Sequence, residues 1–138
     1  MHAIKISLLR SGAILLFGGM ITGLLVAAAM TGKVGADGRM VLGAHLNAIL
    51  GAFIIFGFAM SLKYMKYSET GLRRISLALI ISNYANWLVT ILKAFLHVHG
   101  IDATGQGKND LVFGLLTAFV VLPSLVGIFY WVIGFKKN

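Results

Sequence analysis

Four long apolar segments, separated by short polar stretches, dominate the sequence. They run approximately over residues 8–30, 40–62, 75–96 and 111–135. Each is long enough to cross the hydrocarbon core of a bilayer, which takes about 20 apolar residues in a helix. Pro123 lies inside the fourth segment and is expected to bend it, because proline removes one helical hydrogen bond. The pattern predicts an all-α membrane protein, in which residues 1–138 form a single domain, a bundle of four transmembrane helices.

The composition supports this interpretation, because 59% of the 138 residues are hydrophobic and only 12% are charged. Ordinary soluble domains carry about 25% charged residues. The four spans and their loops use nearly the whole sequence, so no segment remains for a soluble domain. The chain has no cysteine, which excludes disulfides, thiolate nucleophiles and cysteine metal sites.

The distribution of basic residues predicts the orientation of the bundle. If the chain crosses the membrane four times, eight basic residues lie on the same side as both termini: Lys5, Arg10, Lys63, Lys66, Arg73, Arg74, Lys136 and Lys137. The other side has Lys33, Arg39 and Lys108, with Lys93 near the end of the third span. Because lysine and arginine concentrate in cytoplasmic loops, both termini are predicted to be cytoplasmic. The membrane boundary thus accounts for the net charge of +8 without a nucleic-acid partner.

The first segment allows a second interpretation. A basic start, an apolar run and the alanines at 27–29 are also features of a cleaved signal peptide. The run is long for that purpose, and glycines recur at positions 12, 18, 19 and 23. Such glycines are typical of a membrane helix that another helix approaches closely, and we interpret the segment as a span.

Polar side chains inside the membrane are concentrated in the second and third spans. Such groups are costly in lipid and mark functional sites or polar contacts. The members are His45, Asn47, Ser82, Asn83, Tyr84, Asn86, Trp87, Thr90 and Lys93. Asn83, Asn86, Thr90 and Lys93 are separated by three, four and three residues, which places them on one helical face. This polar stripe predicts a lined pocket; the alternative is hydrogen bonding between helices, worth about 0.6 kcal/mol on average.

His45 is the only histidine within a span. At a rise of about 1.5 Å per residue it lies roughly 7 Å below the non-cytoplasmic boundary, at the depth of Thr90, with Asn86 one turn deeper. A neutral imidazole can bind a metal or haem iron, or transfer a proton. The alternative is a histidine that only hydrogen-bonds to a neighbouring carbonyl group. His97 and His99 offer a weaker surface metal site, with two ligands in a loop.

Residues near the predicted boundaries have simpler interpretations. Tyr130 and Trp131 near the cytoplasmic end of the fourth span, with Tyr64 and Tyr67, are typical of interfacial anchors. Lys93 is expected to extend its ammonium group to the membrane surface.

Two short motifs resemble those of a known family. Gly38-Arg39-Met40 followed by Gly43-Ala44-His45-Leu46 resembles the start of the second span in bacterial hydroxylaminobenzene mutases. Tyr84-Ala85-Asn86-Trp87-Leu88 resembles their third-span motif. The wider superfamily includes styrene oxide isomerase, which has a similar Ala-His and a similar aromatic-Ala-Asn. The resemblance covers the four-span layout and, most specifically, residues 38–93.

The resemblance implies a homotrimer in the bacterial inner membrane, with haem b bound between subunits. It implies that His45 is an axial ligand of the iron, which acts as a Lewis acid, and that Asn86 positions the substrate oxygen. The reaction would be an isomerisation without net redox change, of an aryl hydroxylamine to an aminophenol or of an aryl epoxide to an aldehyde. We further expect Asn83 and Thr90 to act with Asn86. The residues expected around them are Tyr84, Trp87 and Asn47 in the substrate pocket, and Arg39 at a haem propionate.

Two positions depart from the family pattern. The family commonly has an asparagine six residues after the histidine, where this chain has Gly51; its Asn47 lies on a different helical face. Thr90 stands where the epoxide isomerase has a tyrosine, which argues against styrene oxide itself as the natural substrate. The alternative functions are a non-catalytic haem protein (a sensor or electron carrier), a small transporter, or a structural subunit. The absence of an intramembrane carboxylate argues against proton-coupled export.

Overall fold

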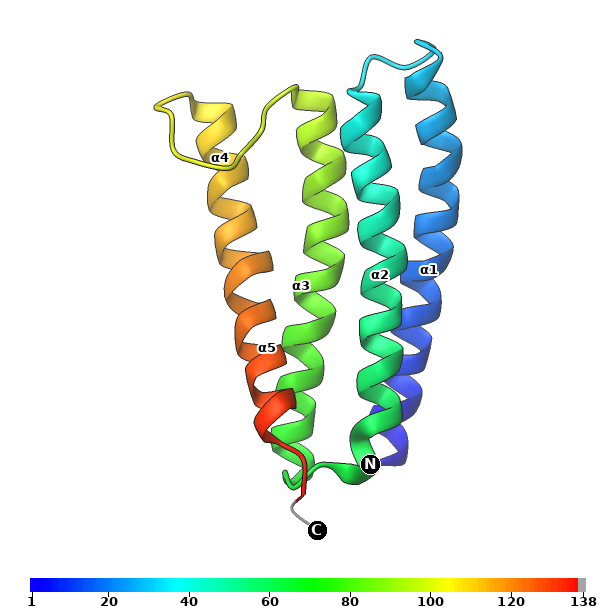
Figure 1. Ribbon diagram of the computed structural model, residues 1–138, viewed down its shortest axis with the longest axis vertical. Helices are drawn as coiled ribbons and strands as arrows, with labels where there is room; N and C mark the ends of the chain where they lie inside the picture. Colours follow the sequence, from blue (N-terminus) through cyan, green and yellow to red (C-terminus); the bar gives the residue numbers. More distant parts are fainter. Residues whose placement is uncertain (137–138) are drawn as a thin grey trace.

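The computed structural model, which describes residues 1–136, is an all-helical antiparallel bundle (Figure 1). Its elements are α1 (His2–Met30), α2 (Gly38–Ser61), a 3₁₀ turn (Leu62–Tyr64), α3 (Glu69–Leu96), α4 (Gly107–Leu116), a π-helical turn (Thr117–Val121) and α5 (Leu122–Ile133). Because α4, the π-helical turn and α5 are continuous, they form one fourth rod. The four rods are all long and apolar enough to cross a membrane. The predicted bundle of four transmembrane helices is therefore confirmed.

Helices α2 and α3 begin earlier than their apolar segments, because capping residues rather than hydrophobicity set their first turns. At α3 the Ser68 side chain accepts a hydrogen bond from the amide of Gly71, and Glu69 places a negative charge in the first turn. At α2 the Asp37 carboxylate accepts hydrogen bonds from the amides of Arg39 and Met40, at 2.9 and 3.1 Å. Both helices thus start in the boundary region, ahead of their apolar stretches.

The Asp37 cap yields a stability prediction. Asp37→Ala removes the acceptor of two amides at the start of α2, and we expect it to lower the free energy of unfolding by about 1 kcal/mol. The matched control is Asp102→Ala, which removes an exposed carboxylate that caps no helix. Thermal unfolding in detergent, followed by circular dichroism, measures the difference. Equal destabilisation by the two variants would contradict the capping role.

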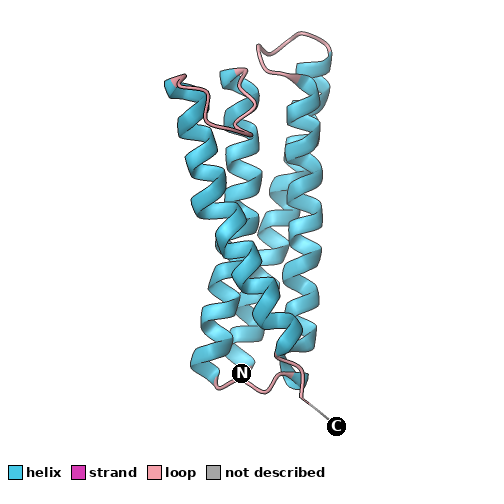
Figure 2. Ribbon diagram, turned by 60° about the vertical axis from the view of Figure 1, so that its left-hand side comes forward, coloured by secondary structure: helices cyan, strands magenta, loops and turns pink. Residues whose placement is uncertain are grey.

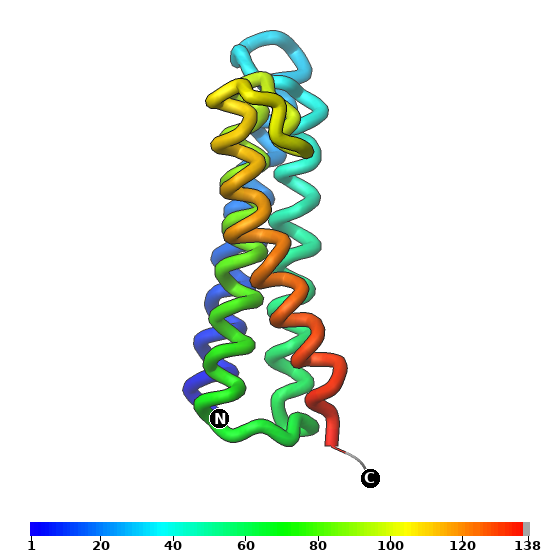
Figure 3. Tube along the Cα trace, turned by 90° about the vertical axis from the view of Figure 1, so that its left-hand side faces the viewer, coloured from blue at the N-terminus to red at the C-terminus, as the bar shows by residue number. Residues whose placement is uncertain are grey.

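The rods pack unequally. α1 lies along α2, α2 along α3, and the fourth rod packs mainly on α3 (Figures 1 and 3). The buried core lies among α1, α2 and α3, and includes Leu8, Leu15, Ala48, Ala52, Ile55, Phe58, Leu72 and Leu79. Small residues allow the close approach of α1, as the sequence predicted: a Cβ atom on Gly19 would lie 2.9 Å from the Cβ of Ala48.

Pro123 lies in the first turn of α5. The sequence predicts a bend at this proline, and the structure has a π-helical turn over Thr117–Val121 directly before α5. Proline has no amide hydrogen to donate to the preceding turn, and π-helices occur mostly as such single turns inside α-helices. The rod continues on both sides of this turn (Figure 2).

Both termini lie at the same end of the bundle, together with the loop between α2 and α3 (Figures 1 and 2). This loop is tied to the chain's end, because the amide of Lys66 donates to the Gly134 carbonyl group at 2.8 Å and that of Lys136 donates to the Tyr64 carbonyl group at 2.9 Å. We call this the terminal end. Its assignment to the cytoplasmic side stays a prediction, and Lys137, which contributed to it, lies outside the described residues.

The structure corrects the interpretation of Trp131 as an interfacial anchor. Its ring packs inward on Phe58, with ring centroids 5.4 Å apart, and against Gly57. The reason is the helical period: Gly127, the buried residue of α5, lies four residues earlier and therefore on the same face. The neighbouring Tyr130 is 44% exposed, as an anchor would be.

Candidate active site

The imidazole of His45 lies against α1 and uses only one of its two nitrogen atoms. Its Nδ1 is 2.7 Å from the carbonyl oxygen of Gly19. Because a carbonyl oxygen only accepts, Nδ1 carries the hydrogen, and Nε2 is the ring nitrogen left for another contact. In residues 1–136, one enclosed side-chain nitrogen or oxygen lacks a hydrogen-bond partner, and it is Nε1 of Trp131. Nε2 of His45 also lacks a partner but is not enclosed, so it is open to the surface of the chain.

Two residues of α1 hold this ring, and one of them, Gly23, makes room for it. Gly19 supplies the carbonyl group, and Gly23 lies one turn further along the same face. A Cβ atom on Gly23 would lie 3.2 Å from Cε1 and 4.0 Å from Nε2 of His45. The hydrogen bond is the contact that a purely structural histidine would make. It is also the contact that a ligating histidine makes with its other ring nitrogen, which sets the tautomer and the ring orientation.

Three polar side chains form a hydrogen-bonded seam between α2 and α3. The amide Nδ2 of Asn47 donates to Oδ1 of Asn86 and to Oγ1 of Thr90, both at 3.2 Å. The hydroxyl of Thr90 donates to the backbone carbonyl group of Asn86 at 2.6 Å. These contacts orient the Asn86 amide with its oxygen towards Asn47. Its Nδ2 has no partner in the described chain and is not enclosed, so it can donate to a ligand.

Asn83 belongs to the same face of α3, one turn towards the terminal end. Its side chain is 9% exposed, and its Nδ2 donates to the Leu79 carbonyl group at 2.7 Å. Three members of the predicted stripe, Asn83, Asn86 and Thr90, therefore do face α2, but they are hydrogen-bonded to Asn47 or to the backbone. The interhelical bonding that was the alternative to a pocket is thus present. Three cavities lie towards the terminal end of the bundle.

Tyr84 and Trp87 face α1 instead. The Tyr84 hydroxyl donates to the Ser11 carbonyl group, and Nε1 of Trp87 donates to Oγ1 of Thr22, each at 2.9 Å. The two rings meet edge to face, with centroids 6.4 Å apart. Trp87 fits because α1 has a glycine there: a Cβ atom on Gly18 would lie 2.7 Å from its ring. The aromatic pair therefore lies on the α1 side, with His45, and away from the α2–α3 seam.

A family model described as styrene oxide isomerase matches residues 4–136, which include all four rods. The chain belongs to the styrene oxide isomerase family. A search of curated proteins finds no match. Membership of the styrene oxide isomerase family confirms the resemblance inferred from the two motifs and indicates an isomerase-type membrane protein.

The structure gives a physical account of one departure from the family pattern. A Cβ atom on Gly51 would lie 2.8 Å from Oδ1 and 2.9 Å from the Cβ of Asn83. The side chain of Asn83 therefore occupies the space that a side chain at position 51 would need. At the other departure, the hydroxyl of Thr90 is held within the seam with Asn47 and Asn86. Asn83 on α3 thus places an amide beside position 51 of α2.

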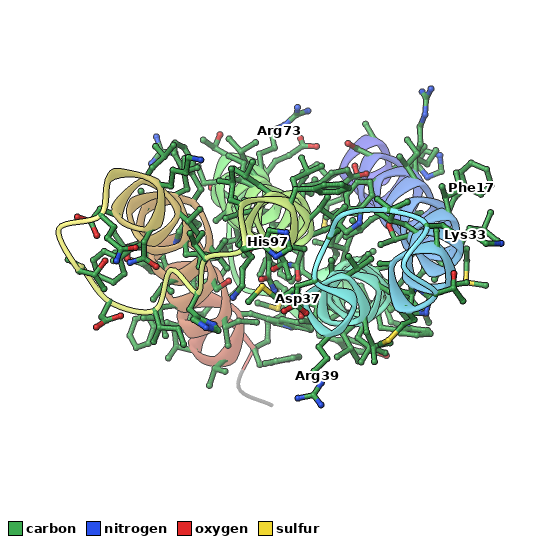
Figure 4. The ribbon with its side chains drawn as sticks, turned by 90° about the horizontal axis from the view of Figure 1, so that it is seen from above. Phe17, Lys33, Asp37, Arg39, Arg73 and His97 are labelled. Carbon is green, nitrogen blue, oxygen red and sulfur yellow. The ribbon has the colours of Figure 1, made fainter. Side chains whose placement is uncertain are left out.

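Two expectations at the end opposite the terminal end have less structural support. Arg39 is exposed and extends away from the bundle (Figure 4), where it contacts none of the proposed site residues. His97 ends α3 in the left-handed conformation, with φ of 53°. No three histidine, cysteine or acidic side chains gather at any place in the described residues, so the surface histidines gain no further ligand.

Sequence reasoning missed the contribution of α1. Gly19, Gly23 and Thr22 hold His45 and Trp87, but α1 has few polar residues and did not suggest a role in the site. The available signal was the spacing of Gly19 and Gly23, four residues apart. This spacing indicates a close helix contact but does not identify the side chain that fills it.

Proposed function

We propose that this protein is a membrane isomerase that rearranges small apolar aromatic substrates without net redox change. The reaction is that of an aryl hydroxylamine giving an aminophenol, or of an aryl epoxide giving an aldehyde. The proposal rests on the family match over residues 4–136. One structural observation supports the site: the His45 imidazole is fixed through Nδ1 and presents an unpaired Nε2.

The residues around His45 fit haem b as the cofactor. An axial histidine needs a free ring nitrogen, a fixed tautomer and room beside the ring, and the Gly19 carbonyl group and Gly23 provide the last two. When bound, the haem iron supplies a Lewis acid for the substrate oxygen. Because Nε2 opens to the surface of one chain, we propose that a second copy covers it, in a homotrimer of this multi-pass membrane protein.

The two halves of the proposed site lie on opposite sides of α2. His45 and Asn47 are two residues apart, which corresponds to about 200° around a helix. His45 accordingly contacts α1, whereas Asn47 contacts Asn86 and Thr90 on α3. Within one chain, the imidazole therefore contacts α1, whereas the Asn86 side chain contacts the opposite face of α2. We therefore propose that His45 of one subunit and Asn86 of its neighbour face the same substrate.

Within such a site each side chain has a defined task. The free Nδ2 of Asn86 donates a hydrogen bond to the substrate oxygen as negative charge develops on it. Asn47 and Thr90 are positioning residues, because they hold the Asn86 amide in one orientation. The apolar helices admit lipid-soluble aromatics and exclude water, which would otherwise capture a reacting cation.

Turnover by the purified protein tests the proposal. We expect the protein, purified in detergent without added cofactor, to show a Soret absorbance band and to isomerise phenylhydroxylamine or an aryl epoxide. A Soret band without turnover of either substrate would favour the second candidate, a non-catalytic haem protein. Turnover without a Soret band would retain the isomerase and reject the cofactor. Neither signal, in a protein with native helix content, would reject both candidates.

A further inference from the structure

A cavity of about 560 Å³ lies at the terminal end of the bundle, away from the candidate active site. It is formed where the first turns of α1 meet the last turn of α2 and the 3₁₀ turn. Its lining includes His2, Lys5, Met60, Lys63, Tyr64 and Phe135. The cavity is open on one side, so a ligand can enter it without displacing a helix.

The rim of this cavity is positively charged. Lys5 and Lys63 both line it, together with His2 and the N-terminal ammonium group. The ammonium group is paired with the Glu69 carboxylate, which is the one salt bridge in residues 1–136. The Lys63 ammonium lies 4.7 Å above the Tyr64 ring, and neither lysine is neutralised by a carboxylate. Two uncompensated lysines therefore border one cavity.

The rest of the lining is apolar. Met60, Leu62 and Phe135 contribute to it, and Met60 and Phe135 are 68% and 47% exposed. Helix α2 ends at Ser61, two residues before Lys63, and the apolar span that contains it ends at Tyr64, so the cavity lies at the boundary of the membrane-spanning segment. A ligand that fits both parts is anionic at one end and apolar at the other.

We propose that this cavity binds an anionic phospholipid. Lys5 and Lys63 contact the headgroup phosphate, and an acyl chain lies against Met60 and Phe135. Basic pockets between membrane helices bind such headgroups, and lysine is a common phosphate partner. The apolar lining favours a lipid over free phosphate, because the acyl chain of a lipid covers this apolar surface and inorganic phosphate leaves it uncovered.

Lipid titration of the full-length protein tests this site. The protein is delipidated in detergent and titrated with phosphatidylglycerol, phosphatidylcholine or inorganic phosphate, while thermal unfolding and retained lipid in native mass spectrometry are measured. We expect saturable stabilisation by phosphatidylglycerol, with a weaker effect of phosphatidylcholine and none of inorganic phosphate. Equal effects of the two lipids would overturn the proposal. Stabilisation by inorganic phosphate equal to that by phosphatidylglycerol would also overturn it, in favour of a free-anion site.

Paired variants separate a bound lipid from general charge attraction. Lys5→Ala with Lys63→Ala is expected to weaken phosphatidylglycerol binding by about fivefold per lysine. Lys66→Ala with Lys136→Ala removes the same charge from the same end but from residues outside the lining, and is expected to retain the preference. Lys5→Arg with Lys63→Arg, which keeps the charge, covers the case in which the alanine pair does not fold. Equal loss of phosphatidylglycerol binding in the two alanine pairs would refute the site. Loss of the preference for phosphatidylglycerol over phosphatidylcholine in the arginine pair would also refute it.

Discussion

His45→Ala is expected to remove the Soret band and to lower isomerase turnover by about 100-fold or more. The variant deletes the ring nitrogen proposed as the axial ligand, and even weaker changes around a ligand cost about 10- to 100-fold in affinity or activity. The helix should tolerate the change, because alanine is a good helix former and position 45 is only partly buried. Absorbance of the purified variant and turnover of phenylhydroxylamine measure the two effects.

A second histidine variant provides the control for His45. His99→Ala removes an imidazole from the exposed loop after α3 and is expected to retain both the band and the turnover. Added imidazole is expected to restore part of the band in His45→Ala, because it can occupy the space of the missing ring. A full Soret band in His45→Ala would contradict the ligand assignment. The hydrogen bond to the Gly19 carbonyl group would then be the whole role of the residue.

Asn86→Ala is expected to lower turnover by about 100-fold while the Soret band remains. Its free amide nitrogen is the proposed donor to the substrate oxygen, and loss of one such donor typically costs about 10²–10³ in rate. Asn47→Ala leaves Nδ2 of Asn86 in place but removes the side chain that donates to Oδ1 of Asn86. We therefore expect a smaller loss of turnover, of about tenfold. Steady-state kinetics measure both, and equal losses in the two variants would contradict the division into donor and positioning residue.

Co-expression of two inactive chains tests whether the site is shared between subunits. His45→Ala and Asn86→Ala chains that mix at random in a cyclic trimer would form about a quarter of their sites with both residues intact. Recovered turnover near that fraction is the expected result. Mixed trimers as inactive as either parent would place His45 and Asn86 in one chain's site and would refute the shared arrangement. Tagging each chain differently confirms that mixed trimers have formed.

Two helix faces, one on α3 and one on α5, show which contacts a sequence pattern can predict and which it cannot. Spacing placed Asn83, Asn86 and Thr90 on one face of the third span, and the structure confirms that this face meets α2. The same reasoning interpreted Trp131 as a boundary anchor, because it used position along the span and not the phase of the helix against its neighbours. The packing of Trp131 on Phe58 depends on the rotation of α5, which no local pattern encodes.

The sequence alone determined the number of helices, their antiparallel order and the concentration of polar groups in the second and third. These features follow from hydrophobicity and helical period, which are properties of neighbouring residues. Only the tertiary structure decided which groups meet: the Gly19 carbonyl group with His45, Asn47 with Asn86, and Asn83 with Gly51. Such partners lie more than 25 residues apart in the chain. Their contacts depend on how each rod is rotated against the next, because a rotation of one helix changes every side chain that faces its neighbour.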